Sequence, residues 1–250
     1  MRREAQNILL LLVGGALLKI TLNGTYLRYV KPTVKPWVLA AGAIMIVLAV
    51  VAIIMDIKAA RPGAVQADPA DDVHDHGHHH HPRSPWLLVL PVLAIFLIAP
   101  PALGADSVLR SDGRNAVTAT APIVQEGASA FPPLPKEAVV PLELSEFITR
   151  SVWDATNSLR GRTVGLTGFI VHDQGSTYVA RLVITCCAAD ATPMKVQLAG
   201  GQADALPDDQ WVAADGELEP GSATAANEYT PTLKVSALDQ ISAPADPYEY

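Results

Sequence analysis

The chain opens with long apolar runs and continues into shorter segments in which apolar and polar residues alternate. Three runs have the length and composition of membrane helices, at about 8–30, 37–55 and 86–104. The second run holds 19 residues without a charge, and about 20 apolar residues cross the hydrocarbon core of a bilayer. Prolines in the third run are compatible with a helix that packs against neighbours in a bundle. Residues 1–105 therefore predict a multi-pass membrane region.

The pattern changes after residue 105. Residues 106–137 show no apolar periodicity and predict a linker, and 138–250 predict a soluble domain. That domain begins with helical spacing over about 144–152, where Ser145 is the candidate N-cap. Period-two alternation then predicts five strands, at 162–172, 177–185, 193–198, 210–219 and 231–241.

Five short strands with glycines in the first are typical of a small Greek-key barrel of the OB type, and an irregular small β-sandwich is the alternative. The expected fold class is thus an α + β membrane protein, with N-terminal transmembrane helices followed by a small OB-like β-barrel domain. In the second strand, the alternation places Tyr178, Ala180, Leu182 and Ile184 on one face.

Charge divides the chain in the same way. The formal charge is +3 over residues 1–104 and −10 over residues 105–250, which gives −7 in total. The acidic half argues against a nucleic-acid partner, because phosphate binding requires clustered Lys and Arg. If the N-terminus lies inside, the Lys and Arg residues near the predicted spans divide evenly between the two sides, so the positive-inside rule does not decide the orientation. The small residues after the third run favour a C-terminal domain outside the cytoplasm, on a multi-pass protein of the cell membrane.

A histidine comb lies in the loop 68–83, between the second and third apolar runs. It contains His74, His76, His78, His79, His80 and His81. Neutral imidazole is a ligand for zinc, copper and nickel, so the comb predicts metal contact with zinc as the first candidate. The alternative is a low-complexity polar loop that is rich in histidine by composition alone.

Cys186 and Cys187 follow the second strand, and Asp190 comes soon after them. Neighbouring residues of a strand point to opposite faces, so a continuing strand would bury Cys186 and expose Cys187. A turn starting at Cys186 would instead bring Cys187 and Asp190 together as a soft-metal site, with His172 as a further ligand if the hairpin register allows it. The alternative is that Cys187 fills space as a small apolar residue and Asp190 caps the turn.

Motifs of catalysis are absent from the sequence. There is no GxGxxG, GxxxxGK[ST], HExxH or GxSxG pattern, and His172 is the only histidine outside the comb. The acids Asp208 and Asp209 fall in a turn and predict solvated side chains. We therefore expect a protein that is not an enzyme.

The stretches "RLVITCCAADATPMKVQL", "WVAADGEL", "TPTLKV" and the terminal "DPYEY" resemble one family. They are similar to the YcgQ-like subunits of two-component membrane permease complexes, and the resemblance covers nearly the whole chain. It implies a polytopic permease subunit as partner and makes this chain a membrane-anchored accessory subunit. Two rival functions stay open at this point: a scaffold that does not transport, and an extracytoplasmic metal chaperone or sensor.

Overall fold

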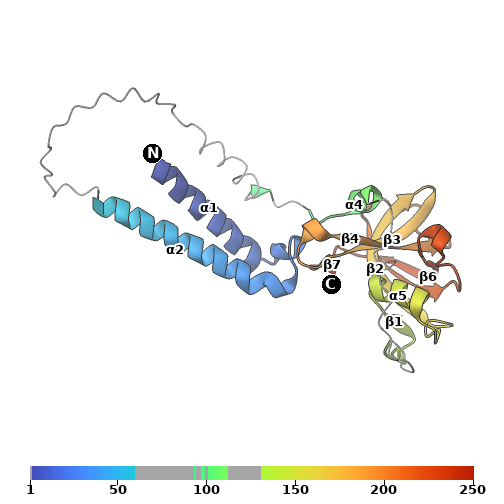
Figure 1. The fold of residues 1–250 in the computed structure, drawn as a ribbon. Helices are drawn as coiled ribbons and strands as arrows, with labels where there is room; N and C mark the ends of the chain where they lie inside the picture. The colour runs from blue at the N-terminus through green and yellow to red at the C-terminus, as the bar shows by residue number, and fades with distance from the viewer. Residues whose placement is uncertain (1, 60–92, 94–96, 99–100, 112–130) are drawn as a thin grey trace, which may run out of the picture. The chain divides into compact units, whose positions relative to one another are not determined.

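The structure is a computed structural model that describes residues 2–59, 93, 97–98, 101–111 and 131–250. The chain divides into two compact units, each described here by itself (Figure 1). The helical unit comprises Met1–Tyr26 and Thr33–Pro100, and the sheet unit comprises Leu27–Pro32 and Pro101–Tyr250. The sheet unit therefore includes a short segment that lies between the two N-terminal helices in the sequence.

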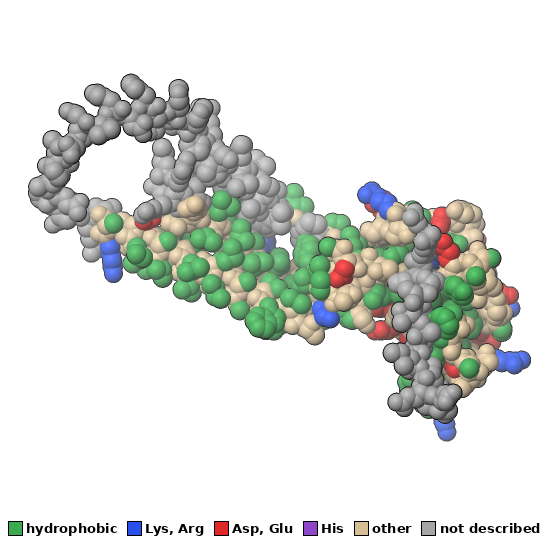
Figure 2. Space-filling model, viewed as in Figure 1, with side chains coloured by type: hydrophobic (Ala, Val, Ile, Leu, Met, Phe, Trp, Pro, Cys, Tyr) green, Lys and Arg blue, Asp and Glu red, His purple; other side chains and the backbone are tan. Residues whose placement is uncertain are grey.

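The helical unit consists of α1 (Arg2–Leu22) and α2 (Lys35–Ala59), which lie side by side (Figure 1). They approach closely at two glycines: a Cβ added to Gly14 would lie 3.0 Å from the carbonyl oxygen of Gly42. Small residues permit this kind of backbone contact between apolar helices. Large apolar side chains such as Trp37 and Leu48 remain exposed on α2, and apolar side chains cover the visible face of the two helices (Figure 2).

One helix among the described residues is long and apolar enough to cross a membrane, judged by length and composition. It spans Pro32–Ala59 with a mean hydropathy of 3.0 over its most apolar window, and could anchor the chain in a bilayer. The first predicted span is shorter than expected. Its apolar part, Gln6–Leu22, ends before Gly24, whose φ of +82° interrupts the helix, and the short 3-10 helix η1 (Thr25–Arg28) follows.

The third predicted span lies largely outside the described residues. Where the description resumes, residues 101–104 are not helical. Residues 106–110, which the sequence assigned to a linker, form α4 (Ala105–Arg110) together with Ala105, and Ala105 and Val108 are buried. A linker was the wrong prediction here because a six-residue helix is too short to show a period.

The sheet unit contains a seven-stranded mixed sheet with the order β1-β2-β5-β6-β4-β3-β7. The strands are β1 (Val139–Pro141), β2 (Thr163–Asp173), β3 (Ser176–Val183), β4 (Thr192–Ala199), β5 (Trp211–Leu218), β6 (Thr232–Gln240) and β7 (Tyr248–Glu249). The five predicted strands correspond to β2 through β6. Strand β2 pairs with both β3 and β5, so these five strands pair in a cycle, and β4 with β6 is its one parallel pair.

The two faces of β3 alternate as the sequence predicted, although β2 and β4 each bury four consecutive residues. Ala180, Leu182 and Ile184 belong to a cluster that also contains the buried residues of α4, whereas Val179 points into the other cluster. That second, larger cluster joins the sheet to α5 (Leu144–Trp153) through Phe147. The sheet is thus buried on both faces where β2 and β3 pass beneath α4.

Helix α5 has the predicted position but not the predicted cap. The N-cap is Glu143, whose side chain makes no capping bond. The backbone N–H groups of Leu144 and Ser145 instead donate to the carboxylate of Glu249 in β7, at 2.8 and 3.0 Å. A carboxylate at a helix N-terminus satisfies unpaired donors and complements the helix dipole.

Candidate functional site

The cysteine turn, residues 184–190, reverses the chain between β3 and β4. Strand β3 ends at Val183, and the 3-10 helix η4 (Ala188–Asp190) follows the two cysteines. The carboxylate of Asp190 reaches back and accepts the backbone N–H groups of Thr185 and Cys186, both at 2.9 Å. Asp190 thereby caps the turn, as the structural alternative predicted, and it also stands beside both thiols.

Three ligand atoms converge in this turn. The thiols of Cys186 and Cys187 and a carboxylate oxygen of Asp190 all lie within 4.8 Å of one another. The two Sγ atoms are 3.5 Å apart, close to the spacing of about 3.8 Å that two sulfurs adopt around tetrahedral zinc. Cys186 is exposed and Cys187 half-buried, so the strand alternation that predicted a buried Cys186 does not extend past the end of β3.

A hydrogen bond from the Cys186 thiol to the Asp190 carboxylate shifts the pKa of both groups. The hydrogen bond from the Cys186 thiol to Asp190, helped by the contact with Cys187, raises the pKa of Cys186 to about 12. The same hydrogen bond lowers the pKa of Asp190 below its usual value. A metal ion that binds here must therefore displace a thiol proton. Two thiolates and a carboxylate form a donor set suited to a soft or borderline divalent ion.

The structure does not bring His172 to the cysteine turn. His172 pairs with Thr177 near the tip of the β2–β3 hairpin, whereas the cysteines follow the far end of β3. Six residues of strand separate these positions by about 20 Å. His172 instead contacts Asp208, whose Oδ1 lies 2.8 Å from Nδ1 and also accepts the His172 backbone N–H. The antiparallel register thus excludes His172 as a ligand of this cluster.

The histidine comb, His74 to His81, lies outside the described residues. The turn acids Asp208 and Asp209, predicted as solvated, both bind other groups. Asp208 orients His172, and Asp209 accepts the backbone N–H of Ala105 at 2.6 Å. Local pattern could not reveal this, because the partners are 36 and 104 residues away in the sequence.

The segment Leu27–Pro32 binds the cysteine turn, a contact that the sequence did not predict. Val30 and Cys187 form an antiparallel bridge. The backbone N–H of Ala188 donates to the carbonyl of Tyr29 at 2.7 Å, and that of Lys31 donates to the carbonyl of Cys186 at 3.4 Å. The turn that gathers the thiols therefore also holds the segment that precedes α2 in the sequence.

Both parts of the chain match a known family. Residues 6–111 match the DUF1980 N-terminal domain, and residues 145–250 match the DUF1980 C-terminal domain. No curated protein and no solved structure gives a match. The two matched regions are consistent with the resemblance to YcgQ-like proteins and account for most of the chain, which therefore belongs to the DUF1980 family.

Proposed function

We propose that the protein is a membrane-anchored accessory subunit of a permease complex and that it binds a divalent transition metal, with zinc as the first candidate. The family resemblance and the span Pro32–Ala59 support the membrane role. The observation that carries the metal-binding role is the convergence of Cys186, Cys187 and Asp190 within 4.8 Å. In this proposal the partner is a polytopic permease subunit in the same bilayer.

The cysteine turn would supply three of zinc's four ligands. Protein zinc sites that keep a fourth position open exchange that ligand for water or another group. The fourth position would then be open to water or another exchangeable ligand. Metal contact by the comb histidines is proposed separately, because neutral imidazole is a ligand for zinc, copper and nickel.

The architecture proposed for this role is a multi-pass anchor followed by an OB-like barrel outside the cytoplasm. The cyclic pairing of β2 through β6, with its single parallel pair between β4 and β6, supports the barrel. No reaction is assigned to it, because the donor set suits metal binding and the sequence holds no catalytic motif. An OB-like fold by itself fixes no function.

Zinc titration of the full chain in nanodiscs tests the proposal. The titration is best made on a comb variant in which all six comb histidines are serine, so that the turn is observed alone. We expect one stoichiometric zinc per chain, lost in the Cys186→Ser/Cys187→Ser variant and weakened in Asp190→Ala. The matched control is Asp239→Ala, which removes an exposed aspartate of β6. Absence of stoichiometric binding would leave the scaffold function in place of this one.

A further inference from the structure

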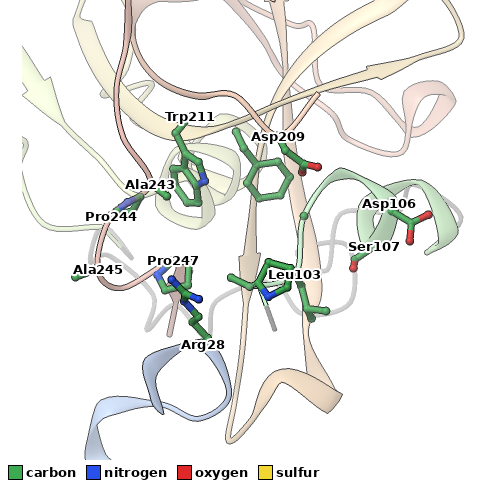
Figure 3. A pocket seen from close by; sticks show the side chains of 14 residues that line it. Arg28, Leu103, Asp106, Ser107, Asp209, Trp211, Ala243, Pro244, Ala245 and Pro247 are labelled. Atoms are coloured by element: carbon green, nitrogen blue, oxygen red, sulfur yellow. The ribbon is translucent and has the colours of Figure 1, made fainter. Parts of the chain in front are cut away.

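A pocket of about 670 Å³ lies in the sheet unit, away from the thiols of the cysteine turn. Segments far apart in the sequence line it: Leu27–Pro32, the residues around Leu103 and Gly104, β2, β5 and the stretch before β7. Figure 3 shows Arg28 rising beside Pro247, with Trp211 across the hollow and Asp209 on the opposite side. Its volume falls within the range of small-molecule sites, about 300 to 1,000 Å³.

Specific hydrogen bonds hold these walls together. The hydroxyl of Tyr248, a residue only 2% exposed, accepts the backbone N–H of Leu103 at 3.2 Å and donates to the carbonyl of Arg28 at 3.0 Å. Burial raises the pKa of this hydroxyl, so it keeps its proton as a donor. One buried side chain of β7 therefore fixes two walls of the pocket.

A second contact fixes the wall near α4. Asp209 accepts the Ala105 N–H, and a Cβ added to Gly104 would collide with its carboxylate. A larger residue at position 104 would therefore displace this carboxylate. Hydrogen bonds thus fix the walls of the pocket on two sides, at Leu103 and Arg28 and at Ala105.

The lining is apolar with charge at its edges. Phe169 and Trp211 form an edge-to-face pair with ring centroids 5.5 Å apart, and alanine and proline side chains complete the apolar wall. Arg28 is the one cationic side chain among the lining residues. Of the two acids, Asp106 pairs with Arg110 at 2.8 Å and Asp209 binds the Ala105 N–H. Both carboxylates are engaged. A guanidinium carries five N–H donors, so it can bind an incoming anion while it keeps other contacts.

We infer that this pocket binds an amphipathic organic anion: an apolar body lies against Phe169 and Trp211, and a single carboxylate or phosphate group meets Arg28. This ligand chemistry is shared by soluble organic acids and by anionic lipids. The inference goes beyond the proposed metal role and does not depend on it. The two sites share only the segment Leu27–Pro32. The cysteine turn forms hydrogen bonds with Tyr29 and Lys31 of this segment, and Tyr248 donates one to the carbonyl of Arg28.

Saturation-transfer NMR with octanoate tests the inference on the full chain in zwitterionic phosphatidylcholine nanodiscs, with empty nanodiscs as background. Octanol and octylammonium serve as neutral and cationic probes of the same length. We expect saturable octanoate binding that octylammonium lacks. Arg28→Gln should weaken octanoate binding about tenfold, as expected for loss of a charge-assisted hydrogen bond, and leave octanol binding unchanged. Trp211→Leu should weaken both octanoate and octanol.

The control is Arg160→Gln, which removes an exposed arginine outside the pocket and should leave octanoate binding unchanged. Nanodiscs with anionic phosphatidylglycerol separate the two ligand sources: suppressed octanoate binding indicates a lipid, and unchanged binding indicates a soluble acid. Equal binding of octanoate and octylammonium by the unmodified chain would overturn the inference, as would full octanoate affinity in Arg28→Gln. Failure of zinc binding would leave this result untouched.

Discussion

Single carboxylate side chains stabilise turns and a helix end of the sheet unit, because they accept backbone N–H groups there. Glu249 binds the first turn of α5, Asp190 binds the cysteine turn, and Asp154 binds the turn after α5. A buried donor that loses its acceptor costs about 1 to 3 kcal/mol, and more when the acceptor is charged. The acidic charge of this half therefore includes structural contacts as well as solvated surface.

Glu249→Ala tests the most buried of these carboxylates. Glu249 is 1% exposed, and its loss leaves two N–H donors of α5 unpaired and Arg181 without its nearby carboxylate, 3.9 Å away. We expect a loss of about 3 kcal/mol in the free energy of unfolding. Chemical denaturation measures it, and Glu249→Gln should give an intermediate loss. Glu217→Ala, at an exposed site of β5, is the matched control, and an equal effect in both would refute the capping role.

Asp154 predicts a pH dependence. Burial raises the pKa of Asp154, but hydrogen bonds from Ser158 and Thr156 outweigh it and lower the pKa from 3.8 to about 2. A carboxyl group whose pKa is lower in the folded chain than in the unfolded chain stabilises the folded state at pH values above its unfolded pKa. This stabilisation is lost as the pH falls from about 4 to about 2. Asp154→Ala should therefore be less stable than the unmodified chain at pH 7 and similar at pH 2. A stability difference that stays constant across this range in denaturation experiments would contradict the assignment.

The elements differ in how far the sequence predicts them. Strands β2 to β6 are long enough to show a period of two, so alternating residues such as Ala180 and Leu182 predicted both the strand and its buried face. Helix α4 and strand β7 are six and two residues long and show no period. Their burial comes from distant partners, as when Tyr248 binds the carbonyl of Arg28 220 residues away.

The candidate site follows the same rule. The sequence offered a turn that joins Cys187 to Asp190 as one of two alternatives, and all the residues involved lie within one short stretch. It added His172 on the condition of a suitable hairpin register, and the observed register does not meet that condition. It also missed the segment Leu27–Pro32, whose contact with the turn depends on the tertiary fold.

Two adjacent glycines provide a test of the α1–α2 contact. Gly14 faces the backbone of Gly42, whereas a Cβ on Gly15 would meet nothing within 4 Å. Gly14→Leu should force the helices apart and cost about 1 to 3 kcal/mol, as overpacked cores do. Gly15→Leu adds the same side chain to open space and should be neutral. Thermal unfolding followed by circular dichroism compares them, and equal melting temperatures would refute the close crossing.

At the scale of the whole molecule, the C-terminal part of the sheet unit begins at Pro101. This position lies within the third predicted span, 86–104, and well before residue 138, where the sequence predicted the start of the soluble domain. The sheet unit includes α4, whose buried Val108 packs in one cluster with Phe169, Val171 and Ile184. A fragment that starts at residue 138 leaves that face uncovered.

Two fragments test this boundary. Both 138–250 and 101–250 should fold with β-rich circular dichroism spectra. The longer fragment should be more stable by about 2 kcal/mol, because burial of a valine-sized side chain contributes about that much. Urea denaturation measures the difference, and Val108→Ser in the longer fragment should remove much of it. Equal stability of the two fragments would show that α4 adds nothing to the sheet unit.

Zinc X-ray absorption spectroscopy on the full-length comb variant tests the central claim most directly, because it counts sulfur ligands. The proposed site predicts two sulfurs at about 2.3 Å, with the remaining ligands being oxygen or nitrogen at about 2.0 Å. The sulfur shell should disappear in Cys186→Ser/Cys187→Ser and persist in Asp239→Ala. A zinc ion bound by oxygen and nitrogen alone, with no sulfur at 2.3 Å, would contradict a metal site in the cysteine turn.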